Sequence, residues 1–221
     1  MLTLSIICAL LASTFALDTD PLAPMAKRCT GMISSLADVA AAQMCTNIII
    51  NSFTVPGGQT FTINAATSAT ITMAGDVTFG FAEWAGPLML VSGTNISFNG
   101  NGHTLFGQGD LYWDGLGGNG GVTKPAPFIR VNNTGSFSNV RILNAPERSI
   151  AVKGSPVTII TATRMYIALG DLPNSRSNGL PAGHNTDGFG ISNANNVIVQ
   201  NSSVHNQGAS ILPSPSASES I

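Results

Sequence analysis

The stretch HNTDGFG, residues 184–190, holds the side chains with the clearest potential for chemistry. Asp187 offers a carboxylate that can accept or donate a proton, which makes it a candidate general base or acid. An Asn-Thr-Asp-Gly sequence also favours an Asx-type turn, so a purely structural role is the alternative. Further along, where a partner for this loop would be sought, residues 206–210 read NQGAS and contain no carboxylate. Asp187 is therefore a candidate catalytic group without an evident partner.

The elements that would position this loop are short runs rich in β-branched residues. Each run has the length of a strand and is bounded by Asn, Gly or Ser. Four apolar residues each precede a turn, at spacings of 40, 21 and 39 residues: Val91, Val131, Val152 and Ile191. An apolar pair follows each turn: Ile96/Phe98, Val140/Ile142, Val157/Ile159 and Val197/Val199. A coil of about 20 residues, with loop insertions in two coils, explains these spacings.

A strand–turn–strand unit repeated at this period is typical of a parallel β-helix. Stacking the coils would create one continuous apolar core, which no single coil could bury alone. An antiparallel sandwich also uses short strands, but the runs here are uneven in length and lack tight hairpin turns between them. The sequence therefore predicts an all-β fold, with a parallel β-helix over residues 29–207.

Residues 32–44 form the one stretch with helical periodicity, and we expect a short helix there that caps the open end of the solenoid. Cys29 and Cys45 flank it. In an oxidising compartment this pair favours a disulfide, which would stabilise the fold by roughly 3 kcal/mol in the chain-entropy model. Metal binding is less favoured, because a structural zinc site needs four ligands.

The N-terminal region has the features of a secreted protein. Residues 1–16 contain a short apolar run followed by small residues, which predicts a signal peptide. Residues 17–28 end in Lys27-Arg28 and are interpreted as a removed pro-segment; the alternative is an exposed basic pair. Three Asn-x-Ser/Thr sequons fit passage through the secretory route; they begin at Asn95, Asn132 and Asn201.

The composition excludes several classes of partner. Nine Lys and Arg against 11 Asp and Glu give a net charge near −2, which provides no electrostatic case for nucleic acid or an anionic membrane. The chain contains no cluster of carboxylates that would hold calcium, and we expect neither metal nor cofactor. A surface rich in Gly, Ser, Thr and Asn but poor in charge suits a polyhydroxylated ligand.

Three aromatic residues beside Gly-rich segments have two interpretations. Trp84, Tyr112 and Trp113 are flat enough to stack on sugar rings. Large aromatic side chains are more often buried, however, so covering the core is the alternative role.

Three motifs in order along the chain carry a family resemblance: EWAGP at 83–87, YWDGLGGNGGVTKP at 112–125 and GHNTDGF at 183–189. Together they resemble the polygalacturonases, pectin-cleaving glycoside hydrolases, and most of all the fungal endo-polygalacturonases. The resemblance extends from Cys29 to about Gln207. It implies a right-handed parallel β-helix, a secreted monomer, and hydrolysis of α-1,4-linked galacturonan with inversion, without a metal.

The resemblance also assigns roles to the loop. Asp187 aligns with a water-activating carboxylate, and Asn185 and His184 would shape the loop and contact the substrate. Inverting hydrolysis needs a second carboxyl group as general acid. The family has Asp-Asp-Cys where this chain has Gly208, Ala209 and Ser210.

Two further departures concern the carboxylates and the C-terminal side. Gly190 replaces another Asp of the family pattern. Residues 208–221 lack the coil pattern, so we expect a disordered tail after a β-helix cut short at about six coils. We therefore expect little or no hydrolysis by this chain. A non-catalytic pectin-binding or decoy protein is the alternative, and a calcium-dependent lyase on the same fold is less favoured.

Overall fold

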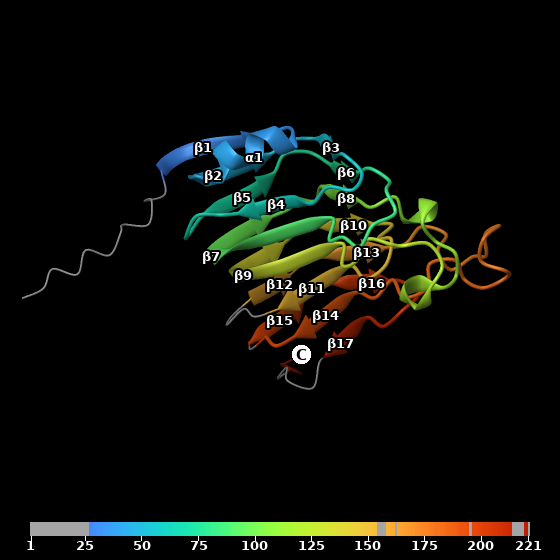
Figure 1. The fold of residues 1–221 in the computed structure, drawn as a ribbon. Coiled ribbons are helices and arrows are strands. Elements are labelled where there is room, and N and C mark those ends of the chain that lie inside the picture. Colours follow the sequence, from blue (N-terminus) through green and yellow to red (C-terminus); the bar gives the residue numbers. More distant parts are fainter. Residues whose placement is uncertain (1–26, 154–157, 162, 195, 214–218, 221) are drawn as a thin grey trace, which may run out of the picture.

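The computed structural model describes residues 27–153, 158–161, 163–194, 196–213 and 219–220. Its strands stack in coils from the N-terminal to the C-terminal side (Figure 1). All the strand pairs are parallel, and crossovers between parallel strands are right-handed in almost all proteins. The predicted all-β, right-handed parallel β-helix is therefore confirmed. The predicted signal peptide, residues 1–16, and residues 17–26 lie outside the described residues.

Three strand faces run along the stack. The first contains β2 (Cys45–Ile50), β5 (Thr70–Met73), the ends of β7 (Met89–Asn99) and β9 (Ile129–Ser138), β12 (Thr158–Thr161), β15 (Val197–Gln200) and β18 (Glu219–Ser220). The second, called the side sheet below, contains β3 (Phe53–Val55), β6 (Val77–Phe79), β8 (Thr104–Phe106), β10 (Arg141–Leu143), β13 (Arg164–Tyr166) and β16 (Ser203–His205). The third contains β4 (Phe61–Asn64), the starts of β7 and β9, β11 (Ile150–Lys153), β14 (Phe189–Ser192) and β17 (Ile211–Pro213).

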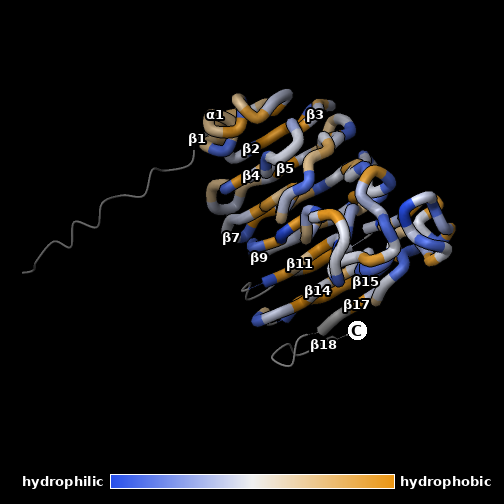
Figure 2. Tube along the Cα trace, turned by 45° about the vertical axis from the view of Figure 1, so that its right-hand side comes forward, coloured by the Kyte–Doolittle hydropathy of each residue, from blue (hydrophilic) through white to orange (hydrophobic). Residues whose placement is uncertain are grey.

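The core consists of columns of apolar side chains, one above another in successive coils. Apolar segments recur in register along the stacked strands (Figure 2). One buried column is formed by Val91, Val131, Val152 and Ile191, paired coil to coil. This confirms the column that the sequence spacings predicted. The two longer spacings come from insertions at 107–128, between β8 and β9, and at 167–188, between β13 and β14.

A second column lies on the first face and differs in part from the prediction. It stacks Phe98, Phe137, Ile160 and Val199 in register. The rings of Phe98 and Phe137 are stacked, with centroids 4.7 Å apart. This column includes Phe98 and Val199 from the predicted pairs and two residues that the prediction did not place.

The predicted pairs Val140/Ile142 and Val157/Ile159 were assigned to the wrong positions. Ile142 lies in β10 of the side sheet, and Ile160 rather than Ile159 is buried in the column; Val157 lies outside the described residues. The prediction placed a turn after Val131, whereas β9 continues through Gly135 to Ser138, with a register shift against β7 between Gly93 and Ile96.

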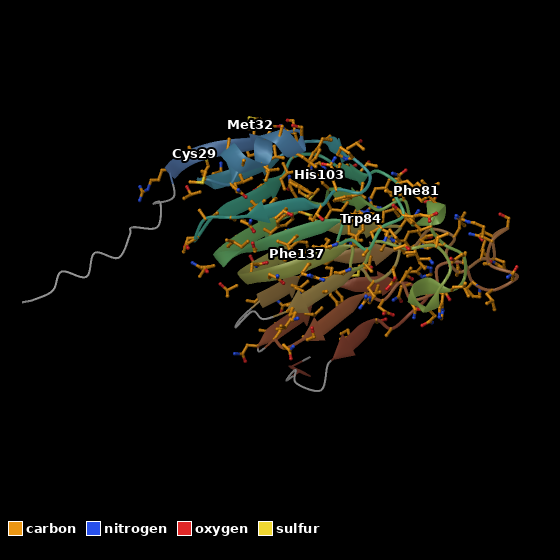
Figure 3. The ribbon with its side chains drawn as sticks, viewed as in Figure 1. Cys29, Met32, Phe81, Trp84, His103 and Phe137 are labelled. Carbon is orange, nitrogen blue, oxygen red and sulfur yellow. A yellow bond between two sulfur atoms is a disulfide. The ribbon has the colours of Figure 1, made fainter. Side chains whose placement is uncertain are left out.

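The predicted helix over residues 32–44 is wrong over most of its length. The segment begins with strand β1 (Lys27–Ile33), whose Ile33 pairs with Ile50 of β2, and continues in the 3-10 turn η1 (Leu36–Asp38). Only α1 (Val39–Ala42) is helical. Met32 is 58% exposed on β1 (Figure 3). Pairing with β2 overrides the helical periodicity, because it satisfies the backbone of β1.

The N-terminal end of the solenoid is nevertheless covered. Two side chains of α1, Val39 and Ala42, are buried in the main core. A disulfide joins Cys29 to Cys45, with Cα atoms 5.0 Å apart, as predicted. It links β1 to β2, so it fastens the covering segment to the first coil. Lys27 and Arg28, interpreted as the end of a pro-segment, lie in β1.

The segment after Gln207 continues the β-helix, contrary to the expected boundary. The amide of Gly188 donates to the carbonyl of Ala209 at 2.9 Å, and the amide of Phe189 donates to that of Ser210 at 2.9 Å. Strand β17 then pairs with β14. The Ser- and Pro-rich composition masked this continuation, because pairing to the preceding coil needs backbone groups rather than apolar side chains.

The contact between α1 and β1 depends on a glycine, which leads to a first prediction. A Cβ atom at Gly31 would lie 2.5 Å from the Cα atom of Ala42. Gly31→Ala should therefore lower the free energy of unfolding by about 1–3 kcal/mol through overpacking. Thermal and urea unfolding under non-reducing conditions would measure this. The matched control is Gly190→Ala, whose Cβ would meet nothing closer than 3.7 Å; equal losses in both variants would contradict the prediction.

Candidate functional site

Asp187 lies at the corner between the side sheet and the third face, at the end of the insertion 167–188. Its side chain is buried, with 6% of the residue exposed. One carboxylate oxygen, Oδ1, accepts the amide of Ala209 at 2.9 Å. Its backbone carbonyl accepts the amide of Ser149 at 2.7 Å. The residue is thus held from both sides, by the coil before it and the coil after it.

Backbone and side-chain hydrogen bonds join this corner to the next coil. The hydroxyl of the buried Thr186 accepts the amide of Gln207 at 2.9 Å and donates to the carbonyl of Gly183 at 2.7 Å. The side-chain amide of Asn206 donates to the carbonyls of Thr186 at 2.9 Å and Ala209 at 3.1 Å. Asn206 and Gln207 therefore position the polypeptide directly beside Asp187.

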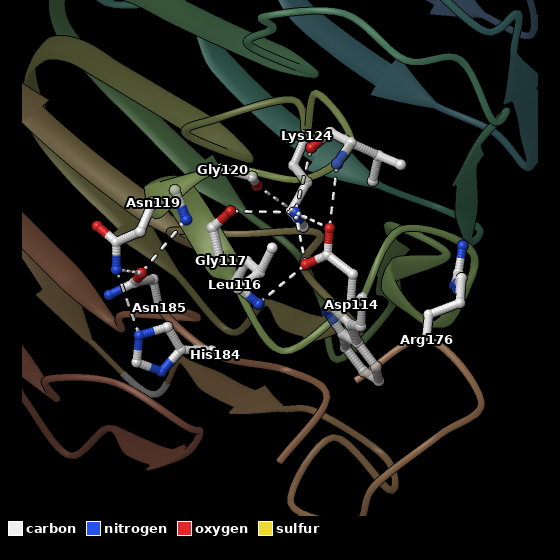
Figure 4. Close-up of polar contacts among 12 residues, drawn as sticks. Asp114, Leu116, Gly117, Asn119, Gly120, Lys124, Arg176, His184 and Asn185 are labelled. Carbon is white, nitrogen blue, oxygen red and sulfur yellow. Dashed lines mark hydrogen bonds and ion pairs between the residues drawn. The ribbon is translucent and has the colours of Figure 1, made fainter. Parts of the chain in front are cut away.

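The two predicted substrate-binding residues face the other insertion. Asn185 adopts a left-handed conformation with φ of 55°, and its Oδ1 accepts the amide of Gly118 and the side chain of Asn119, both at 3.2 Å. His184 is exposed, with its Nε2 3.5 Å from the side-chain nitrogen of Asn119 (Figure 4). Asn185 therefore ties the insertion 107–128 to the corner, while the imidazole of His184 remains accessible to a ligand.

A buried ion pair organises the insertion 107–128. The Nζ atom of Lys124 lies 2.9 Å from both carboxylate oxygens of Asp114 and donates to the carbonyl of Gly117 at 3.0 Å (Figure 4). The carboxylate of Asp114 also accepts the amides of Leu116 and Val122. Burial raises the pKa of Asp114, but these hydrogen bonds and the Lys124 charge outweigh it and lower the pKa below its ordinary value.

The aromatic residues of the same insertion are structural. Tyr112 and Trp113 are buried. The hydroxyl of Tyr112 accepts the amide of Ala82 at 3.0 Å, and the indole of Trp113 donates to the carbonyl of Ala145 at 3.1 Å. Burial raises the pKa of Tyr112. Of the two interpretations, core packing is confirmed for these residues; Trp84 is half-buried against the main core.

The positions that face Asp187 in the next coil carry no carboxylate. A Cβ atom at Gly208 would collide with the Oδ1 atom of Asp187, so the carboxylate occupies the space that a side chain would need. Gly190, another position where the resemblance expects an Asp, lies in β14 and pairs with Ala151 of β11. Among these aligned positions, Asp187 is the carboxylate that the chain retains.

One carboxylate near the corner was missed by the sequence analysis. Glu147 is buried between β10 and β11, and its Oε1 accepts a hydrogen bond from the Nε atom of Arg148 at 3.1 Å. Gly118 lies against it, since a Cβ there would be 3.0 Å from the same oxygen. Glu147 belongs to the coil before Asp187, as does Ser149, which bonds to Asp187. A Glu-Arg pair between two strand-sized runs was the available signal.

Other predicted features can be placed but not assigned a role. Asn95, Asn132 and Asn201 are exposed, so glycosylation at these sequons stays a prediction. Among the described residues, no three His, Cys, Asp or Glu side chains come together as a metal site. No helix in this part of the chain is long and apolar enough to cross a lipid bilayer.

Comparison with known proteins identifies close relatives of this fold and site. The sequence model described as Glycosyl hydrolases family 28 matches residues 45–212. The polygalacturonase of Saccharomyces cerevisiae is 37% identical over 211 residues, covering 93% of this chain and 54% of the relative. The polygalacturonase of Cochliobolus carbonum is 41% identical over 166 residues, covering 74% of this chain and 43% of the relative.

A solved structure has a similar fold. Endopolygalacturonase I from Stereum purpureum, complexed with two galacturonate molecules, superposes with a TM-score of 0.72 at 38% identity. The match covers 80% of this chain and 51% of that structure. This chain spans about half the length of the curated relatives that it matches.

The lowered pKa of Asp114 predicts how stability depends on pH. A carboxyl group with a lowered pKa stabilises the fold above its ordinary pKa, and this stabilisation is lost as the pH falls through the folded-state value. Asp114→Asn should lose about 3 kcal/mol of stability at pH 7, because Lys124 stays buried without its counter-charge. The free energy of unfolding of Asp114→Asn should also fall less between pH 5 and pH 3 than that of the parent chain.

Urea unfolding of both proteins across this pH range would measure the two effects. The control replaces both partners, Asp114→Leu with Lys124→Met, and should be less destabilised than Asp114→Asn, since no buried charge is left unpaired. Parallel pH profiles for the parent chain and Asp114→Asn would contradict the assignment.

Proposed function

The chain belongs to glycosyl hydrolases family 28, and we propose that the corner around Asp187 is a galacturonan-binding site of the polygalacturonase type. In this proposal Asp187 is the water-activating carboxylate of an inverting hydrolysis. The exposed His184 contacts the polysaccharide. Asn185 holds the insertion 107–128 beside it through its hydrogen bonds to Gly118 and Asn119. The ligand is the galacturonan of pectin, and the protein acts as a monomer without a metal.

We propose further that this chain binds galacturonan with little or no hydrolysis. Inversion needs two carboxyl groups about 6.5–9.5 Å apart, one to protonate the leaving oxygen and one to activate water. The observation that carries the proposal is the hydrogen bond from the amide of Ala209 to Asp187. It places Gly208 and Ala209 beside the carboxylate, where the resemblance expects two acids. In this proposal the chain therefore acts as a pectin-binding protein of the family rather than as an efficient hydrolase.

Glu147, against which Gly118 of the insertion 107–128 packs, is a carboxylate to consider as a replacement acid. Its oxygen already accepts a hydrogen bond from Arg148. Because Glu147 is already engaged with Arg148, it is a poor substitute for the missing acid.

We place this function outside the cell. The Cys29–Cys45 disulfide favours an oxidising compartment. The apolar residues 1–16 and the three exposed sequons are consistent with a secretory route.

The activity of the purified chain tests the proposal directly. Reducing-sugar release from polygalacturonate should not exceed that of Asp187→Asn, because no general acid is available at Gly208. Both proteins should nevertheless be retained on immobilised pectate and released by moderate salt. The polygalacturonase of Saccharomyces cerevisiae serves as the positive control. Release by the parent chain that is lost in Asp187→Asn and in Glu147→Gln would show instead that Glu147 supplies the acid.

Restoring the two acids provides the complementary test. The double variant Gly208→Asp, Ala209→Asp should release reducing sugar roughly 10²-fold or more above the Asp187→Asn background, since each acid–base group contributes about 10²–10⁴-fold. The side chain of Asp187 must rotate to accommodate the new Cβ atom. The matched control is Gly208→Asn, Ala209→Asn, which has the same shape without the acids. Equal rates in the two double variants, both folded and retained on pectate, would refute the assigned roles.

A further inference from the structure

The outward face of the side sheet carries two ladders of side chains outside the corner site. Strands β8, β10, β13 and β16 pair in parallel and in register, so residues at the same position stand one above another. One ladder consists of Thr104, Arg141, Arg164 and Ser203, and the other of Phe106, Leu143, Tyr166 and His205. The residues between them point inward: Leu105, Ile142, Met165 and Val204. The outward face of β10 and β13 is therefore basic along one line and largely apolar or aromatic along the other.

Arg141 and Arg164 form an uncompensated pair of positive charges. They are direct neighbours on strands that lie about 4.8 Å apart, and like charges at such a position destabilise a sheet. Both side chains are exposed, and neither guanidinium makes a hydrogen bond or ion pair with any described residue. An anion between the two guanidinium groups would remove this repulsion and satisfy their donors.

The acidic groups at the edges of this surface already have partners. Asp76, which precedes β6, is engaged by the Nδ1 atom of His103 at 3.3 Å and by the amide of Thr104 at 2.8 Å. It belongs to the end of the sheet nearer the N-terminus. Asp110, at the far edge, contacts Asn144 at 3.4 Å. Neither carboxylate forms an ion pair with Arg141 or Arg164, so the pair is free to receive a ligand.

The ladder that contains Tyr166 and His205 provides an aromatic surface beside the two arginines, on which a sugar ring could pack. The rings of Tyr166 and His205 are 5.0 Å apart with an angle of 35° between their planes, and Tyr166 is 48% exposed. The three strands enclose a groove of ≈440 Å³ that is lined by both arginines and both rings. A second hollow of ≈240 Å³ adjoins it, lined by the same arginines and by Asn139 and Asn201.

We propose that this groove is a second binding site for acidic sugars, separate from the corner around Asp187. A sugar carboxylate would bind the guanidinium groups of Arg141 and Arg164, for which bidentate recognition of carboxylates is well suited. The apolar face of the pyranose ring would pack on Tyr166. The combination of a carboxylate receptor and a ring platform selects a uronate over a neutral sugar or a simple anion. The identity of this uronate as galacturonate rests on the proposed function.

The two sites would bind either two parts of one galacturonan chain or two separate chains. The corner lies where the insertion 167–188 returns to the third face, whereas the groove lies on the sheet that this insertion leaves at Tyr166 (Figure 1). A weak second site raises the local concentration of polymer at the first, because the second binding event becomes intramolecular. The groove would thus hold the protein on pectin even when the corner is empty.

Residue-resolved NMR can distinguish the two sites. The full chain, enzymatically deglycosylated so that no glycan on Asn201 obstructs the groove, is titrated with tri-galacturonate. The side-chain Nε–H signals of Arg141 and Arg164 report on the groove, and the amides of Gly118 and Ala209 report on the corner. We expect both sets of signals to shift and to saturate. Shifts at the arginines with silent corner amides would refute the proposed function alone, and the reverse would refute the groove alone.

Matched variants test the role of the charges. The double variant Arg141→Gln, Arg164→Gln should weaken binding of tri-galacturonate to the groove roughly tenfold or more, because hydrogen bonds to charged groups are lost. The NMR signals of the Tyr166 ring measure this affinity. The control Arg28→Gln, Lys153→Gln removes the same net charge from exposed positions elsewhere and should leave the affinity within about twofold. Equal weakening by both double variants would overturn the proposal, since it would show nonspecific attraction.

Two further probes test the chemistry of the ligand. Maltotriose, a neutral trisaccharide, should not shift the arginine signals, and inorganic phosphate should displace tri-galacturonate only at a large excess. Equal shifts by maltotriose would show that the carboxylate is not recognised. Equal competition by phosphate would show that the sugar ring is not recognised. Either result would overturn the assignment.

Discussion

In-register stacking of the coils is the constraint on which the rest of this structure depends. Every backbone hydrogen bond of a parallel strand goes to the coil before or after it, so a residue at a given position must face its equivalents at a spacing of about 4.8 Å. The same rule produces the buried column from Val91 to Ile191, the exposed pair of Arg141 and Arg164, and the contact of Asp187 with Ala209. Core, groove and corner site are three outcomes of one geometry.

The insertions depart from this rule and are fastened by polar contacts instead. Residues 107–128 leave the stack after the side sheet, and the buried pair of Lys124 and Asp114 holds them together. Asn185 then attaches this insertion to the corner through Gly118 and Asn119. Rigid contacts of this kind fix the position of a reacting group before the ligand arrives. The corner is therefore ordered by loops, although the β-helix determines where those loops begin and end.

Features that depend on the periodic burial of side chains could be predicted from the sequence. Features that depend on which backbone segments pair could not. The spacings of 40, 21 and 39 residues gave the buried column, and the two cysteines gave the disulfide. Residues 32–33 were assigned to a helix because their side chains fit its period, whereas their backbone pairs with β2. Residues 208–213 were assigned to a tail because they lack the coil pattern, whereas Ala209 and Ser210 bond to the preceding coil. Glu147 was missed because its burial arises from contacts distant in sequence.

Stacking also determines which groups face Asp187 from the next coil. Carboxylates on adjacent coils lie close together, and like charges at this distance raise the pKa of one another and oppose folding. With Gly208 and Ala209 in the next coil, Asp187 has no acidic neighbour there and accepts the backbone amide of Ala209 instead. The missing side chain at Gly208 leaves room for the oxygen that accepts this bond. In the proposed function, the residues that leave Asp187 without a general acid therefore also spare it a like-charged neighbour.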